Sequence, residues 1–368
     1  MNEYLSRKIR FLSFFAIVGV VFCHAYNYYN RFLQPTTVLY EGPNPGTMLQ
    51  FMISNGLVRF GVPLFFAFSG YLFFLSYDGT CKGYINKVLK RLRTLLVPYV
   101  IWTLLAGGVL YAVYRFVGME RYSIVSEHIY ALKTFGISKW FENSPAFQLW
   151  YIAHLLRLVV ISPLIYVLVK KCKLVPVIFF GLLWLLEITI FINCEGLFFF
   201  TVGAYLAVHR KSIRGMEPIC DSTCNVVRYK RNTWLFTMLW IVGCFSYSLL
   251  SGVFGNRAFV PLILWGLYKV NVITGLVSVW RLYDLNCGAW QEKKWIQTAV
   301  GSTMFVYVSH EPLLHLLTDV CLERMVFNGV HTLTYFGISA FVIVLCVVVG
   351  TGFKKVCPKG YGLLTGGR

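Results

Sequence analysis

Two histidines lie where a charged group is costly, inside long apolar runs of the sequence. His24 comes near the end of the run over residues 9–28, and His310, followed directly by Glu311, lies in the run over residues 296–318. An ionisable side chain in a membrane helix loses hydration, so it faces a protein interior or a water-filled cavity and marks a functional site. A neutral imidazole can act as a base, and a carboxylate can orient it. These residues predict acid-base chemistry within an apolar protein.

The same groups fall at one depth if each run is a helix that crosses a bilayer. With a rise of about 1.5 Å per residue, His24 lies about 24 Å along its helix, and His310 and Glu311 lie about 21 to 23 Å along theirs. Arg59, close to the outer start of the next run, reaches the same level. We therefore predict that these four residues form one catalytic layer, in which the guanidinium holds an anion.

Four other ionisable residues lie within the runs. Glu187 shares the level of the catalytic layer, His154 lies slightly deeper than the outer surface, and Arg157 and Lys269 lie near mid-bilayer. For Glu187, Arg157 and Lys269 we expect hydrogen bonds between helices, or a long cationic side chain that reaches the interface. Arg157 also stays, with His154, among the candidate substrate contacts.

The composition indicates the kind of protein that holds these groups. Of 368 residues, 57% are hydrophobic and only 13% are charged, with a mean hydropathy of +0.64, which is too apolar for a soluble globular protein. We predict an all-α, polytopic membrane protein: a bundle of about ten transmembrane helices, forming a single domain over residues 1–368. The expected spans cover residues 9–28, 54–76, 95–115, 147–169, 174–193, 195–208, 234–252, 258–280, 296–318 and 334–353.

The net charge of +19 follows mainly from membrane topology. Basic residues gather in the turns after the second and fourth runs, which we place in the cytoplasm because cytoplasmic loops carry an excess of Lys and Arg. With this alternation both termini are cytoplasmic. A nucleic-acid partner would need a basic face on a soluble domain, so we expect contacts with anionic membrane lipids and no nucleic acid.

Three further patterns carry less information. Residues 116–146 form the longest predicted outside segment, which is either an amphipathic lid or a surface loop. The pair Cys220 and Cys224, with His209 upstream, is too small a ligand set to predict a metal, and we expect no metal and no bound cofactor. The first run is longer than the h-region of a signal peptide and no small-residue cleavage site closes it, so we expect a retained span.

Several short motifs, taken in their order along the chain, resemble those of the acyltransferase family 3 membrane proteins, which O-acylate sugars of bacterial surface glycans, lipids and antibiotics. The motifs are Val20 to Ala25, Arg59 to Phe66 with Ser69 to Leu72, the basic turn Lys90 to Tyr99, Leu149 to Ile152 with Ser162 to Leu164, Phe199 to Leu206, and Ser309 to Leu313. Singly these motifs are weak, but their order is fairly specific and covers most of the chain.

The resemblance implies an enzyme of the bacterial cytoplasmic membrane that passes an acyl group, commonly acetyl, from cytoplasmic acyl-CoA to a hydroxyl of an extracytoplasmic sugar or glycolipid. It implies His24 as base or acyl carrier, Glu311 or His310 as the orienting or proton-relaying group, and Arg59 at the oxyanion or a phosphate. The implied substrate contacts are Trp150, Tyr151, His154, Arg157 and Ser69. The implied donor contacts are Arg10, Ser13, Lys90, Arg91 and Arg93.

Two positions depart from the family pattern. Ser13 stands where the first motif has an arginine, eleven residues before the histidine, and Arg10 lies three residues earlier on nearly the same helix face. Ala153 and His154 stand where many relatives have Arg and Asp. These departures concern the acyl-donor side more than the fold.

The buried charges also fit a different class of protein, a carrier or flippase for a glycan, a lipid-linked sugar or a small acid, which would use them for binding and proton coupling. We detect no clear inverted repeat that would favour this alternative. An enzyme predicts a new ester formed from acyl-CoA, whereas a carrier predicts flux without one.

Overall fold

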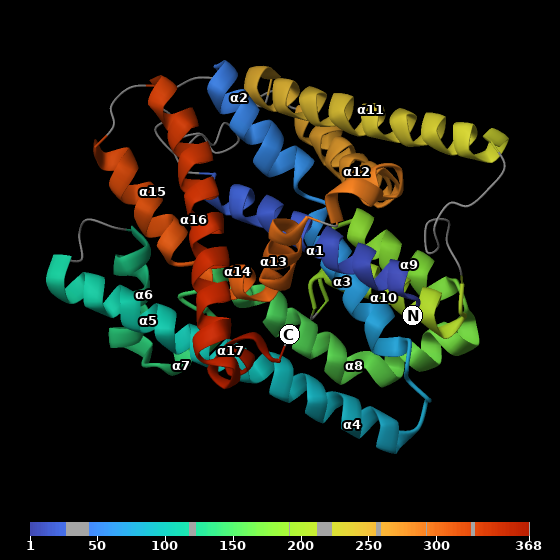
Figure 1. Ribbon diagram of the computed structural model, residues 1–368, viewed down its shortest axis with the longest axis horizontal. Coiled ribbons are helices and arrows are strands. Elements are labelled where there is room, and N and C mark those ends of the chain that lie inside the picture. Colours follow the sequence, from blue (N-terminus) through green and yellow to red (C-terminus); the bar gives the residue numbers. More distant parts are fainter. Residues whose placement is uncertain are drawn as a thin grey trace. The chain divides into compact units, whose positions relative to one another are not determined.

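The structure is a computed structural model that describes residues 1–26, 44–117, 123–190, 192–211, 223–254, 259–291, 293–324 and 328–367 (Figure 1). Every regular element in these ranges is a helix, which confirms the all-α prediction for this part of the chain. The helices are α1 (Glu3–Ala25), α2 (Pro45–Phe51), η2 (Met52–Leu57, π-helical), α3 (Gly61–Phe74), α4 (Cys81–Arg91), η3 (Leu92–Leu96, π-helical), α5 (Val97–Val117), α6 (Ser123–Phe135), α7 (Ser138–Glu142), η4 (Phe147–Leu149, 3₁₀), α8 (Trp150–Cys172), α9 (Val175–Leu185), α10 (Cys194–Val208), α11 (Thr223–Phe254), α12 (Val260–Gln291), α13 (Lys294–Gly301), α14 (Thr303–Ser309), α15 (Leu313–Arg324), α16 (Asn328–Val356) and α17 (Pro358–Thr365).

Seven helical stretches in the described residues are long and apolar enough to cross a membrane, as expected of a multi-pass membrane protein. They are Glu3–Ala25, Pro45–Phe74, Cys81–Val117, Phe147–Cys172, Val226–Phe254, Val260–Leu285 and Thr332–Val356. Two more expected spans are the shorter apolar helices α9 and α10, and the run over residues 296–318 is divided among α13, α14 and α15. The count of ten spans and the cytoplasmic termini therefore stay predictions.

The chain divides into two compact units. Unit 1 consists of Met1–Phe65, Ser212–Gly301 and Cys321–Ala340, and unit 2 consists of Phe66–Lys211, Ser302–Val320 and Phe341–Arg368. The helices α3, α15 and α16 each contribute residues to both units. The expectation of a single domain over residues 1–368 stays a prediction.

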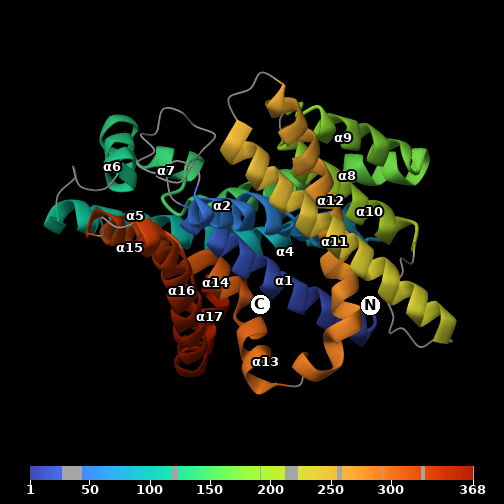
Figure 2. The same ribbon diagram turned by 90° about the horizontal axis from the view of Figure 1, so that it is seen from above.

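Unit 1 is built on the pair α11 and α12, which pack side by side (Figures 1 and 2). The pair is antiparallel, because Thr233 of α11 contacts Arg281 of α12 while Tyr247 of α11 packs with Val260 at the start of α12. The helix α1 contacts η2, α12 and α13. The buried apolar residues of α1 therefore pack against other helices of the same unit.

The contact between α1 and η2 depends on a glycine. A Cβ at Gly19 of α1 would lie 2.9 Å from the Cβ of Val58, so the two segments approach closely only because this side chain is absent. Three residues along α1, the carbonyl of Phe22 accepts a hydrogen bond from Ser54 Oγ at 3.0 Å. Because the residue numbers rise on α1 as they fall on η2, the two segments run antiparallel.

Unit 2 contains the mutually contacting helices α8, α9 and α10, seen together in green in Figure 1, and the second half of α3. Glycines again permit the closest approach: a Cβ at Gly70 of α3 would lie 2.1 Å from the carbonyl oxygen of Phe200, and one at Gly203 of α10 would lie 2.1 Å from that of Ala67. Both glycines belong to motifs singled out in the sequence. Their role in this structure is close backbone packing of two helices.

Candidate active site

In unit 2, the helix that the sequence predicts over residues 296–318 is broken. The helix α14 ends at Ser309 and α15 begins at Leu313, with His310, Glu311 and Pro312 between them. Neither ionisable residue of the break has more than 1% of its surface exposed. Pro312 explains the break, because a proline cannot continue the hydrogen-bond ladder of the preceding helix. By contrast, Pro163 lies within the continuous helix α8.

The ring of His310 is oriented by the backbone. Its Nδ1 lies 2.9 Å from the carbonyl oxygen of Val306, one turn earlier. A carbonyl can only accept, so Nδ1 carries the proton in this contact and the neutral ring keeps its lone pair on Nε2. His310 therefore has the tautomer that a base or an acyl carrier acting through Nε2 requires.

The carboxylate of Glu311 contacts a residue that the sequence analysis missed. Nδ1 of His315, one turn along α15, lies 2.7 Å from Oε1 of Glu311, and the His315 backbone N–H donates to Oε2 at 3.4 Å. The ring of Phe147 meets the His315 ring edge-on, with the centroids 5.3 Å apart. The four-residue spacing between Glu311 and His315 was the signal available in the sequence, since such residues share a helix face.

The segment before α8 is attached to the same break. The side-chain amide of Gln148 donates to the carbonyl of Val308 at 3.1 Å, and the hydroxyl of Tyr307 donates to the carbonyl of Gln148 at 2.8 Å. Gln148 is buried, and its own side-chain oxygen has no hydrogen-bond partner among the described residues. These contacts fix the start of α8 beside His310 and Glu311.

Several predicted substrate contacts lie at this start of α8. Tyr151 exchanges a hydrogen bond of 2.9 Å with Ser69 of α3, and its ring lies 6.1 Å from that of Tyr307. Trp150 packs on the half-buried ring of His154, with 5.6 Å between centroids. The structure therefore brings Ser69, Trp150, Tyr151 and His154 into one region of unit 2. Arg157, two turns along α8, is exposed.

His24 and Arg59 belong to unit 1. His24 is half-buried in the last turn of α1, and Arg59, which follows the π-helical η2, donates to the side-chain oxygen of Asn55 one turn back. The neighbouring Ser54 donates to the carbonyl of Phe22, two residues before His24 on α1. A π-helical turn often marks a functional site.

The predicted donor contacts are divided between the units. Arg10 is exposed on α1 in unit 1, where its Nε donates to the carbonyl of Ser6 at 3.4 Å, and Ser13 is half-buried one turn later. In unit 2, Lys90 and Arg93 are exposed and Arg91 is partly buried around the junction of α4 and η3. No ligand tests these five residues, so their roles stay predictions, as do those of the catalytic and substrate residues.

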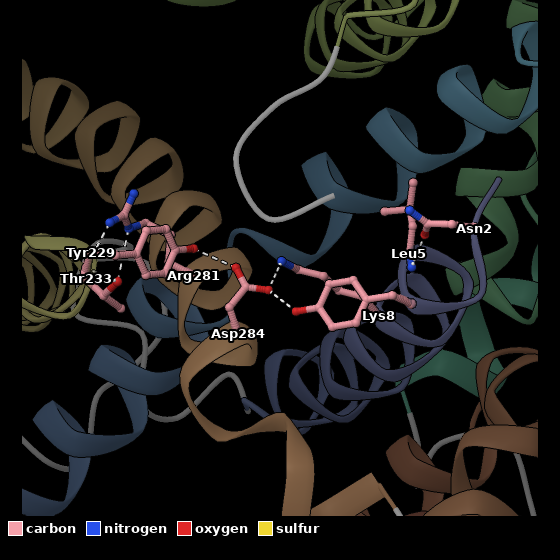
Figure 3. Close-up of polar contacts among 8 residues, drawn as sticks. Asn2, Leu5, Lys8, Tyr229, Thr233, Arg281 and Asp284 are labelled. Carbon is pink, nitrogen blue, oxygen red and sulfur yellow. Dashed lines mark hydrogen bonds and ion pairs between the residues drawn. The ribbon is translucent and has the colours of Figure 1, made fainter. Parts of the chain in front are cut away.

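Unit 1 holds a second buried polar cluster that the sequence analysis overlooked (Figure 3). Lys8 of α1 donates to Asp284 of α12 at 2.6 Å, and both side chains are fully buried. Tyr4 also donates to this carboxylate, and Tyr229 of α11 does so at 2.6 Å. Arg281 donates to the carbonyl of Tyr229 at 3.0 Å. Lys8 resembled one more basic residue ahead of a membrane span, so its sequence context gave no signal.

The remaining predictions concern the outside segment and the cysteine pair. Residues 116–146 include the short helices α6 and α7, and whether they act as a lid is untested. Cys220 and the side chain of Cys224 lie outside the described residues. His209, which preceded the pair, places its Nε2 3.0 Å from the carbonyl of Val169.

The comparisons with known proteins agree with these observations. The family model of the acyltransferase domain matches residues 8–351, so the chain belongs to this family and is an acyltransferase, as the motifs predicted. It is similar to the succinoglycan biosynthesis protein ExoH of Rhizobium meliloti (strain 1021), with 25% identity over 384 residues that cover 100% of this chain and 94% of that protein. No solved structure matches the chain.

Proposed function

We propose that this acyltransferase transfers an acyl group, most simply acetyl, from cytoplasmic acyl-CoA to a hydroxyl of an extracytoplasmic sugar or glycolipid in the bacterial cytoplasmic membrane. The observation that carries the proposal is the buried pair His310 and Glu311 at a helix break, in a chain of the acyltransferase family. The name of the similar protein ExoH supports a glycan acceptor. Family membership also favours transfer over the carrier alternative.

The proposed chemistry assigns three tasks. His24 acts as the base that takes the hydroxyl proton, or carries the acyl group on its imidazole. His310 and Glu311 orient it or relay protons, and Arg59 stabilises the oxyanion or holds a phosphate of the acceptor. A bound metal or cofactor is not needed for these steps, and acyl-CoA is a co-substrate.

Substrate binding is proposed at the two sides of the membrane. The aromatic rings of Trp150 and Tyr151 suit the apolar faces of a sugar, with Ser69, His154 and Arg157 as polar partners for its hydroxyls. For the donor, the exposed cations Lys90 and Arg93, with Arg91, suit the phosphates of CoA. Arg10 and Ser13 are the proposed donor contacts on α1.

The test measures radiolabel transferred from acetyl-CoA into a membrane glycan fraction. The intact protein is compared with His24→Ala, and with His209→Gln as a control for replacing a histidine elsewhere, all at matched membrane levels. We expect label with the intact protein and the control, and a loss of about 100-fold or more with His24→Ala. Equal label from His24→Ala would contradict the role of His24, and no label from the intact protein would contradict acetyl-CoA as donor.

A further inference from the structure

A second imidazole contacts the buried carboxylate of Glu311, and none of the tasks above uses it. His315 Nδ1 lies 2.7 Å from Glu311 Oε1, a distance typical of a strong charge-assisted hydrogen bond. The Glu311 side chain has no exposed surface, whereas 22% of the His315 side chain is exposed. The pair therefore links a fully buried carboxylate to a partly exposed imidazole ring.

The positions of Glu311 and His315 are both fixed by the surrounding structure. Glu311 lies in the helix break and His315 in the first turns of α15, so their separation is set by local backbone geometry. The edge-on ring of Phe147 fixes the plane of the His315 ring. Phe147 precedes Gln148, which is hydrogen-bonded to α14.

An imidazole between a carboxylate and water has a particular capability. It can accept a proton at one nitrogen and release one at the other near neutral pH, which neither an amide nor a lysine can do. A permanent cation, by contrast, neutralises a carboxylate without passing a proton on. Asp284 has such a partner in Lys8.

We propose that Glu311 and His315 form a proton-transfer pair through which the proton of the acceptor hydroxyl leaves the site. The inference rests on the proposed function. In that reaction the hydroxyl O–H bond breaks and its oxygen forms the ester bond, while the acyl–sulfur bond breaks and the thiolate leaves with the electron pair. The proton taken from the hydroxyl is relayed to Glu311 and then to Nδ1 of His315, which accepts it in the tautomer that carries its proton on Nε2. Nε2 releases that proton to water, and the ring regains the starting tautomer by proton exchange with water. The thiolate takes a proton from water on the donor side.

The first experiment uses the acetyl-transfer assay on the full chain with His315→Ala, His315→Asn and Glu311→Gln. Asparagine can still donate a hydrogen bond to Glu311 but has no second nitrogen that accepts a proton. We expect all three variants to lose about 100-fold in rate. Added imidazole is expected to restore His315→Ala at least about tenfold and to leave Glu311→Gln unchanged, which a purely structural histidine would not produce.

Two results would overturn the pair. One is wild-type transfer by His315→Asn, which would reduce His315 to a hydrogen-bond donor. The other is a His315→Ala protein that is stable in detergent, inactive and not restored by imidazole. His209→Gln serves as the control and keeps the wild-type rate.

A second measurement tests the contact between Glu311 and His315 without depending on transfer activity. Infrared spectra of the purified protein identify the Glu311 carboxyl band as the one lost in Glu311→Gln. We expect this band to shift in His315→Asn, because the imidazole contact is replaced by a weaker amide contact. An unshifted band would contradict the pair. The intact protein could transfer no acetyl group while the Glu311 band still shifts in His315→Asn. In that case the proposed donor or acceptor is wrong, but the contact between Glu311 and His315 is supported.

Discussion

Asp284 in unit 1 and Glu311 in unit 2 are both buried carboxylates, yet their partners differ in kind. Asp284 receives hydrogen bonds from Lys8, Tyr4 and Tyr229, and one of these partners carries a permanent charge. Glu311 contacts His315, which is charged only when protonated. A carboxylate neutralised by a lysine keeps one state and stabilises the fold, whereas one beside an imidazole can gain and lose a proton.

The ammonium group of Lys8 is also surrounded by aromatic rings. Its ammonium lies 3.8 Å from the centroid of the Trp280 ring, and two tyrosine rings lie within 6 Å. A cation that faces aromatic rings and a carboxylate is held by several interactions at once. Burial alone therefore does not identify a catalytic acid. Whether a buried carboxylate can exchange a proton depends on the side chain that it contacts.

The largest effect is expected from Glu311→Gln. This change keeps the volume of the side chain and removes its ability to take a proton, so acyl transfer should fall by about 100-fold or more while the protein remains stable. Initial rates at matched protein levels measure the loss. Glu195→Gln, a change to a carboxylate that accepts a hydrogen bond from Trp184, is the matched control and should stay within about twofold. An equal loss of transfer rate in Glu311→Gln and Glu195→Gln would contradict a specific role of Glu311.

The next effect concerns stability. Lys8→Met leaves the buried Asp284 without its cation and should lower the free energy of unfolding by about 3 to 5 kcal/mol. Thermal unfolding in detergent measures the change, and Lys8→Met with Asp284→Leu should recover part of it. The exposed pair Arg7 and Glu3 on the same helix supplies the control, because Arg7→Gln should cost about 0.5 kcal/mol or less.

A Lys8→Met protein that is fully stable but inactive in acyl transfer would show that Lys8 and Asp284 take part in the reaction and do not merely stabilise the fold. That outcome would reverse the roles assigned to the two buried carboxylates. Retained activity per folded molecule would support them.

The smallest effect is expected at His128 of α6, an imidazole without a catalytic assignment. Burial lowers the pKa of His128 below its usual range, and the nearby Glu127 opposes this only in part. The unfolded chain therefore binds a proton that the folded protein resists, so stability should decline as the pH falls below about 6.5. His128→Asn should flatten this decline between pH 7.5 and 5.5 and leave acyl transfer at neutral pH unchanged. The same pH dependence in both proteins would contradict this role.

The class of fold and the positions of the main candidate residues could be predicted from the sequence. Apolar runs of bilayer length predicted a helical membrane protein, and His310 with Glu311 stood out because charges inside such runs are costly. The order of short motifs predicted the acyltransferase family, which the family model confirms. The fold class needed only composition and the length of the apolar runs, whereas the family came from the resemblance of the motifs.

The contacts between side chains could be seen in the structure alone. It divided residues 296–318 into three helices, placed His315 on Glu311, and joined Lys8 to Asp284 across 276 positions of the chain. A contact between distant segments depends on how helices pack, and a lysine before a membrane span reads in sequence as a topology signal whether or not it is buried. The energy of a buried charge is set by its neighbours in space, which is why the structure was needed to distinguish the surroundings of the two buried carboxylates.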